Sequence, residues 1–376
     1  MRRLRTMFAV VIAFALVAAA CGDDTGGTTT TAAPTTTAAP TTTTEADPRA
    51  DWPDSLVFGF VPSREAEELQ DNVDILAGIL ADALDMEVSG IVTSDYTALG
   101  VALGTGEAQI GAFAPANYVL ASRIYPNIEL LAQSVRFGSA TYHAQYFTND
   151  PSVCGADPVE GAFEYDATGT VIAVGPTETP ALQVGWNADD TREEGVSAGL
   201  ACPEPVDLSV IEGRTMAFGT ESSTSGYIFP VLELIAAGLT QDVDYNSCYS
   251  GSHDNSVLFV YGSSVCGGDE NRADFGVSFD DARRNVREAS PDVGEKVIVF
   301  NISAPIANDV IAVDANLPEN LKDAIFQAIA DFMSTEEGVA VMDDIYSWTD
   351  LIRANDLTRA SFLLIEQAID QLGFGT

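Results

Sequence analysis

The sequence predicts an α/β protein large enough for two domains. From residue 56 onward, short apolar runs typical of strands alternate with segments of helical spacing. This alternation indicates a mostly parallel sheet covered by helices on both faces. About 325 of the 376 residues remain once the N-terminal tail is set aside, which exceeds the usual size of one compact core.

The first elements follow this alternation closely. The helix expected over 64–84 places Leu69, Val73, Leu76 and Leu80 on one face, at spacings of three or four residues. The elements expected here are, in chain order, strand 56–61, helix 64–84, strand 88–92, helix 97–104, strand 109–113 and helix 117–124.

The alternation stops over 150–207, which is rich in Gly, Pro, Asp and Glu and which we expect to be irregular. Residues 257–260 and 273–278 flank a second irregular stretch. The elements expected in this half are strand 215–220, helix 227–238, strand 296–302 and helices 321–333, 336–345 and 359–372.

The N-terminus predicts an export signal over residues 1–20. Three arginines near Met1 precede an apolar run over 7–20, and this run is too short to span a membrane. Cys21 follows three alanines and resembles the lipidated cysteine of a bacterial lipoprotein signal. We therefore expect an extracytoplasmic protein anchored to the cell membrane by lipid at Cys21. The alternative is ordinary secretion with cleavage after Ala20.

Residues 21–50 predict an extended tether that follows the anchor. Twelve of the twenty residues over 25–44 are Thr, interleaved with Ala and Pro. Such a segment has almost nothing to bury and cannot offset the entropy lost on ordering.

The acidic composition excludes several classes of partner. The chain has 56 acidic and 17 basic residues, giving a formal net charge of −39. Nucleic-acid binding and adhesion to anionic membranes both need clustered basic residues, so we expect neither. The chain has two histidines and no CxxC spacing, so we expect no metal site. We also expect no cofactor.

The four cysteines beyond Cys21 predict disulfides, because an exported chain folds in an oxidising compartment. They are Cys154, Cys202, Cys248 and Cys266. Three pairings are possible. We favour Cys154–Cys202 with Cys248–Cys266, because each of these pairs brackets a segment that looks like an inserted loop.

The sharpest local motif is Ser222-Ser223-Thr224-Ser225-Gly226, between an expected strand and an apolar helix. A helix N-terminus presents unsatisfied N–H groups and a partial positive charge. Hydroxyl groups beside it would add neutral donors, so the motif predicts an anion site that contains no basic residue. The alternative is a plain Ser/Thr helix cap.

Six segments resemble the phosphate/phosphite/phosphonate-binding proteins of ABC importers, in the family's order, from about residue 56 to 373. They are Phe58-Gly59-Phe60-Val61-Pro62-Ser63, Thr93-Ser94-Asp95-Tyr96, Gly106-Glu107-Ala108-Gln109-Ile110-Gly111 with the following Pro115-Ala116-Asn117-Tyr118-Val119-Leu120-Ala121, Ser223-Thr224-Ser225-Gly226-Tyr227, Ser250-Gly251-Ser252-His253-Asp254 and Pro305-Ile306-Ala307-Asn308-Asp309.

This resemblance implies the type II periplasmic binding protein fold, with two α/β lobes joined by two crossing strands. Lobe 1 would comprise residues 51–145 and 303–376. Lobe 2 would comprise residues 146–302, with insertions near 150–207 and 261–272.

The resemblance also implies a ligand site in the cleft between the lobes. The side chains expected to donate to an oxyanion are Tyr96, Tyr142, Ser223, Thr224, Ser225 and His253. Asp309 resembles the family carboxylate that meets the other end of the ligand, either an amine or a P–OH group. Asp281 is expected to serve the same amine, although Asp280 beside it leaves the alignment open.

The function implied is that of a solute-binding lipoprotein of an ABC importer, acting as a monomer with a membrane permease. It would capture a phosphonate, phosphite or phosphate. The alternative is a surface lipoprotein of the same fold with a sensing or structural role. We do not expect an enzyme, because the sequence lacks a G-x-S-x-G elbow and a P-loop. Ser252, His253 and Asp254 are neighbours in the chain, and neighbouring side chains rarely form a triad.

Overall fold

The computed structural model describes residues 47–63, 66–136, 139–165, 171–175, 183–186, 199–262 and 273–373. The predicted signal peptide, Cys21, most of the tether and Cys266 lie outside the described residues. The described chain contains two large mixed sheets and one two-stranded ladder.

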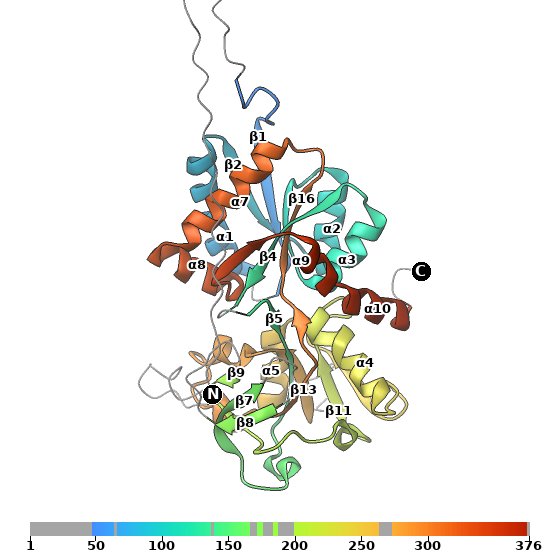
Figure 1. Cartoon of the computed structure of the whole chain (residues 1–376). Helices are drawn as coiled ribbons and strands as arrows, with labels where there is room; N and C mark the ends of the chain where they lie inside the picture. Colours follow the sequence, from blue (N-terminus) through green and yellow to red (C-terminus); the bar gives the residue numbers. More distant parts are fainter. Residues whose placement is uncertain are drawn as a thin grey trace, which may run out of the picture. The chain divides into compact units, whose positions relative to one another are not determined.

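The first sheet has the strand order β17-β4-β16-β3-β1-β2. Its strands are β1 (Ser55–Phe60), β2 (Glu87–Val92), β3 (Ile110–Phe113), β4 (Ile128–Val135), β16 (Val310–Asp314) and β17 (Asp350–Arg353). Its helices are α1 (Ala66–Leu84), α2 (Tyr96–Thr105), α3 (Pro115–Ile124), α7 (Glu319–Met333) and α8 (Glu336–Tyr346). In Figure 1, α1, α7 and α8 lie on one side of this sheet and α2 and α3 on the other. Leu69, Val73, Leu76 and Leu80 are buried, as their spacing predicted.

The prediction of a mostly parallel sheet is wrong for three of the five strand pairings of this sheet. β1 pairs in parallel with β2 and with β3. β16 runs antiparallel to β3 and to β4, and β17 runs antiparallel to β4. β16 returns from the second sheet, so it enters in the reverse direction, and local sequence patterns carry no information about that direction.

The second sheet has the order β12-β11-β13-β6-β14-β10-β7-β8, and β9 also pairs with β7. Its central strands are β6 (Ala144–Thr148), β11 (Thr215–Phe218), β12 (Asn246–Tyr249), β13 (Phe275–Phe279) and β14 (Ile298–Ile302). The helical segments of this part are η1 (Pro151–Cys154), η4 (Leu208–Ile211), η5 (Thr224–Ile228), α4 (Phe229–Ala236), α5 (His253–Tyr261), η7 (Ala282–Val286) and α6 (Val293–Lys296).

The chain passes between the two sheets through a small ladder. After β4 it continues through β5 (Thr141–Tyr142) into β6, and after β14 it returns through β15 (Ile306–Ala307) into β16. β5 and β15 pair in antiparallel fashion. The imidazole of His143 also bonds the carbonyl oxygen of Ser303 through Nδ1, at 2.8 Å, so the two passages are joined side by side.

The segment 150–207 contains strands where we expected irregular chain. They are β7 (Val159–Tyr165), β8 (Val171–Gly175), β9 (Gln183–Trp186) and β10 (Leu200–Ala201), and β10 joins them to β14 of the second sheet. The disulfide Cys154–Cys202 confirms that half of the favoured pairing. Cys248 is also disulfide-bonded, and its expected partner Cys266 lies outside the described residues.

Two helix predictions need correction. α5 was not predicted, because its apolar residues form one continuous run over 257–261, and such a run shows no helical spacing. The expected helix 359–372 is two helices, α9 (Asp356–Ser361) and α10 (Leu363–Leu372), separated at Phe362. Asn355 starts α9 earlier than expected, because its side chain accepts the N–H groups of Leu357 and Thr358.

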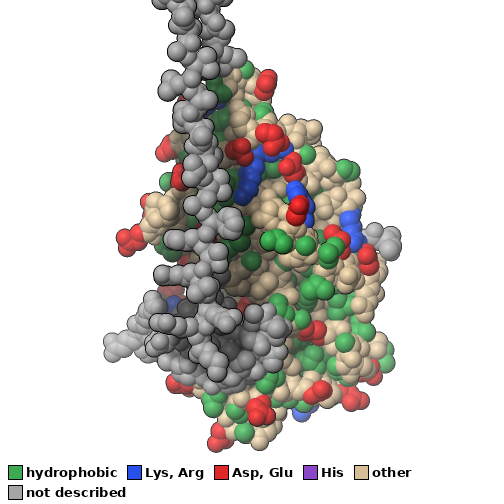
Figure 2. Space-filling model, in the orientation of Figure 1, with side chains coloured by type: hydrophobic (Ala, Val, Ile, Leu, Met, Phe, Trp, Pro, Cys, Tyr) green, Lys and Arg blue, Asp and Glu red, His purple; other side chains and the backbone are tan. Residues whose placement is uncertain are grey.

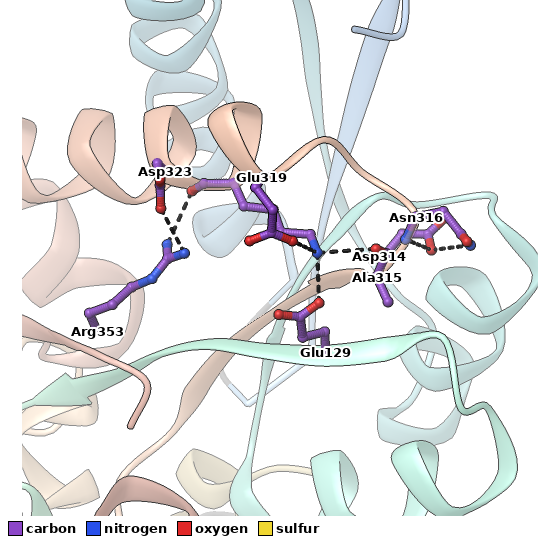
Figure 3. A network of polar contacts seen from close by, with 8 residues as sticks. Glu129, Asp314, Ala315, Asn316, Glu319, Asp323 and Arg353 are labelled. Atoms are coloured by element: carbon purple, nitrogen blue, oxygen red, sulfur yellow. Dashed lines mark hydrogen bonds and ion pairs between the residues drawn. The ribbon is translucent and has the colours of Figure 1, made fainter. Parts of the chain in front are cut away.

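A buried ammonium group links α7 to β4. Lys322 Nζ bonds Glu129 at 2.6 Å, Glu319 at 2.7 Å and the Ala315 carbonyl oxygen at 3.1 Å, and Figure 3 shows Glu129 and Glu319 directed at it. The Lys322 side chain is 2% exposed, so these acceptors take the place of the water molecules that the cation loses on burial.

Among the helices within the described ranges, none has both the length and the apolar character needed to cross a membrane.

Candidate functional site

A cavity of about 30 Å³ lies where residues of both sheets meet. Seven of the eight predicted ligand residues line it. The lining residues are Val61, Ser63, Tyr96, Ala114, Arg136, Tyr142, Ser223, Thr224, Ser225, His253, Phe279, Asp309 and Tyr346.

Ser223, Thr224 and Ser225, which we call the hydroxyl cluster, follow β11 and open a helix. The helix begins at Thr224 instead of residue 227, and its first turn, η5, is a π-helix. Ser223 is the N-cap, and its Oγ accepts the Gly226 N–H at 3.1 Å. The cap interpretation therefore holds for Ser223. It does not account for Thr224 and Ser225, which lie in the first turn with exposed fractions of 1% and 2%.

Thr224 connects the two halves of the site. Its Oγ1 accepts the N–H of Ala116, at the start of α3, at 3.0 Å. Pro115 occupies the first turn of α3, and the N–H groups of such a turn have no partner within their own helix. Because Oγ1 serves as the acceptor in this bond, the Thr224 hydroxyl keeps its hydrogen for a second contact.

His253 is held in one tautomer by its neighbours. The backbone N–H of Phe279 donates to Nδ1 at 3.2 Å, so Nε2 carries the hydrogen of the neutral ring. Nε2 lies 3.3 Å from Ser223 Oγ. His253 is the first residue of α5, whose N-cap Ser252 accepts the N–H of Asn255. The imidazole therefore presents an N–H donor to the hydroxyl cluster.

Tyr96 and Tyr142 reach the hydroxyl cluster from the other side. Tyr96 begins α2, which Asp95 caps, and its phenol bonds Ser223. Tyr142 lies in β5, and its phenol bonds Ser225. Burial, and secondarily the negative charge of Asp309, raises the pKa of both phenols. Both remain protonated at neutral pH and can donate hydrogen bonds.

The prediction of an anion site without a basic residue is wrong, because Arg136 lines the cavity. Its Nη2 pairs with Asp309 Oδ2. Its guanidinium lies over the Tyr142 ring, 4.8 Å from the centroid. Arg136 directly follows β4, where the chain leaves the first sheet, and this position belongs to no sequence motif.

Asp281 is not brought to the cavity. Its carboxylate makes a buried ion pair with Arg283 at 2.7 Å and accepts from Gln145 at 2.6 Å. This carboxylate also caps η7 by accepting the backbone N–H of Arg283. The neighbouring Asp280 accepts the His143 N–H at 3.2 Å, and burial raises the pKa of its carboxyl to about 7.

Of the remaining lining residues, Val61 and Ser63 belong to the segment 58–63 of the resemblance, but we expected no ligand role for them. Ala114, Phe279 and Tyr346 belong to no motif. Val61, Ser63 and Ala114 follow strands β1 and β3, and Phe279 ends β13. Tyr346, the last residue of α8, donates its O–H to the Val61 carbonyl oxygen. The described ranges hold no group of three or more His, Cys, Asp or Glu side chains that could bind a metal ion.

Comparisons with known proteins show the family and the fold of the chain. Residues 58–358 match the family described as ABC transporter, phosphonate, periplasmic substrate-binding protein. Among solved structures, PhnD1 from Prochlorococcus marinus in complex with methylphosphonate is 16% identical with a TM-score of 0.61, covering 85% of this chain and 98% of that one. A binding protein component of an ABC phosphonate transporter from Pseudomonas aeruginosa is 14% identical with a TM-score of 0.58, covering 84% and 87%. A Xanthomonas citri protein bound to chloride ion is 15% identical with a TM-score of 0.57, covering 85% and 99%. These likenesses confirm the α/β fold of periplasmic binding proteins.

Proposed function

Because this chain belongs to the family of periplasmic phosphonate-binding proteins of ABC transporters, we propose that it captures a phosphonate, phosphite or phosphate in the described cavity. The family is one of extracytoplasmic binding proteins, not of enzymes.

One observation carries the proposal: neutral donors from both sheets converge on one buried cavity. The phenol of Tyr96 comes from α2 beside the first sheet, and that of Tyr142 from β5 in the connecting ladder. The hydroxyl cluster and His253 come from elements beside the second sheet. Each hydrogen bond to a charged acceptor contributes about 1.5–3 kcal/mol. A tetrahedral oxyanion offers several acceptor positions, which matches such a ring of donors.

Capture would involve a hinge motion between the two lobes, 51–145 with 303–376 and 146–302. The paired passages β5 and β15 connect the sheets, so a small change there would open or close the cavity. Closure would bring Ala116 to Thr224, as in the described conformation. The closed monomer would then deliver its ligand to a membrane permease, with lipid at Cys21 holding it near the cell membrane.

Titration calorimetry and thermal shift with phosphate, phosphite, methylphosphonate and sulfate test this proposal. A true ligand at 100 times its dissociation constant adds about 2.7 kcal/mol to the unfolding free energy. Ser225→Ala should weaken binding about tenfold through loss of one charge-assisted hydrogen bond. Ser361→Ala is the matched control, because that hydroxyl bonds its own helix at the Thr358 carbonyl oxygen. A flat response of the unmodified protein across the panel would contradict capture and favour a structural role.

A further inference from the structure

The carboxylate of Asp309, in the cavity, already has a cation and a hydrogen-bond donor as partners. Asp309 is the one Asp or Glu among the described residues that line the cavity. Its Oδ2 accepts from Arg136 Nη2 and, at 3.3 Å, from the indole N–H of Trp348. The Trp348 side chain is fully buried, so both partners are held in place by packing.

Arg136 is fixed in this pairing by its surroundings. The guanidinium lies 4.8 Å from the centroid of the Tyr142 ring and 5.9 Å from that of Phe279. Its side chain is 12% exposed. The backbone of Arg136 exchanges two hydrogen bonds with Ser139, each at 2.9 Å, which anchors the residue at the end of β4. A cation stacked on aromatic rings and paired with a carboxylate has little freedom to leave.

The pairing decides which charges a ligand can carry. An ammonium group bound in a desolvated site needs an uncompensated carboxylate. Asp309 is neutralised by Arg136, and the other candidate, Asp281, is paired with Arg283 away from the cavity. An ammonium group beside Asp309 would also lie close to the Arg136 cation, which repels it.

We propose that Arg136 is a specificity-determining residue, which restricts this site to small oxyanions with a neutral substituent and excludes those with an ammonium tail. This inference rests on the proposed function. Methylphosphonate and 2-aminoethylphosphonate are the probes, because they share the phosphonate group and differ in the ammonium-bearing tail.

Calorimetry on the unmodified protein gives the first test. We expect methylphosphonate to bind at least 100-fold more tightly than 2-aminoethylphosphonate. Comparable affinities for the two probes would overturn the inference and leave the proposed function intact. Binding of neither probe, nor of phosphite or phosphate, would contradict the proposed function itself.

Substitutions at the ion pair give the second test. Arg136→Gln leaves the Asp309 charge uncompensated, so methylphosphonate affinity should fall at least tenfold while 2-aminoethylphosphonate affinity rises. Arg136→Gln combined with Asp309→Asn removes both charges, so it should recover methylphosphonate binding and still reject the ammonium ligand. An unchanged ratio of the two affinities in Arg136→Gln would overturn the role of Arg136.

Two further variants keep this test decisive. Asp309→Asn alone leaves the Arg136 cation unopposed, so the preference for methylphosphonate should increase, the opposite of Arg136→Gln. This variant also serves if Arg136→Gln fails to fold, as judged by thermal melting. Arg214→Gln is the matched control, because it removes the same charge from an exposed ion pair with Asp274. It should change neither affinity.

Discussion

Replacement of Thr224 by valine tests the site most directly, because the two side chains have nearly the same shape. The change removes the hydrogen that would reach the oxyanion, which costs about 1.5–3 kcal/mol. It also removes the acceptor of the Ala116 N–H, now bonded at 3.0 Å. A buried donor without a partner costs about 1–3 kcal/mol more. If the ligand-free protein is already in the closed conformation, the second cost is the same before and after binding and leaves the affinity unchanged.

The expected loss of affinity in Thr224→Val is therefore at least tenfold, and several hundredfold if closure accompanies binding. Calorimetry with the best ligand of the oxyanion panel measures it. Thr224→Ser keeps the hydroxyl and should bind within about threefold of the unmodified protein. Thr105→Val is the matched control, because its hydroxyl bonds the Val101 carbonyl oxygen within α2. A dissociation constant of Thr224→Val within threefold of the original would refute the reasoning.

Two predictions concern stability. Asp280→Asn keeps an oxygen for the His143 N–H but cannot ionise. The carboxyl pKa of Asp280 is about 7 in the folded protein and about 3.9 in an unfolded chain, so its burial costs stability increasingly as pH rises from 4 to 7. The melting temperature of the variant relative to the original protein should therefore rise between pH 4 and 7 and level off above pH 7, and a difference that stays constant between pH 4 and 7 would contradict this. Cys154→Ala with Cys202→Ala opens a bond that spans 48 residues and should lower the unfolding free energy by about 2–4 kcal/mol in urea titration; an unchanged midpoint would count against it.

The elements of the first sheet could be predicted because their signals are local. Leu69, Val73 and Leu76 recur at helical spacing and are all buried in α1. The direction of β16 could not be predicted, because it depends on a strand that returns from the other sheet after more than 150 residues. The inserted strands β7 to β10 were missed because short runs between Gly and Pro carry little pattern. Their order comes from pairing with one another and, through β10 alone, with β14.

The candidate site likewise contains residues that one local motif predicts and residues that only the fold brings together. Ser223, Thr224 and Ser225 are consecutive, so their joint presence in the cavity follows from one motif. The pairing of Arg136 with Asp309 joins residues that are 173 positions apart, and a lone arginine after a strand has no local signature. The resemblance suggested Asp281 as a ligand residue. Its buried ion pair with Arg283 does not show in a sequence pattern.

The acidity of the whole chain and the chemistry of the cavity can now be treated separately. In a chain with a net charge of −39, the motif over 222–226 predicted an anion site built from neutral donors alone, and Arg136 shows that a cation is present. Its pairing with Asp309 nevertheless leaves the lining residues with no net formal charge. On the face seen in Figure 2, acidic side chains are scattered over the surface rather than gathered in one patch. Their repulsion is screened beyond about 8 Å at physiological salt, so it slows the approach of an anion more than it weakens the bound state. Affinity therefore depends on the buried donors, and the ion pair decides which substituent the anion can carry.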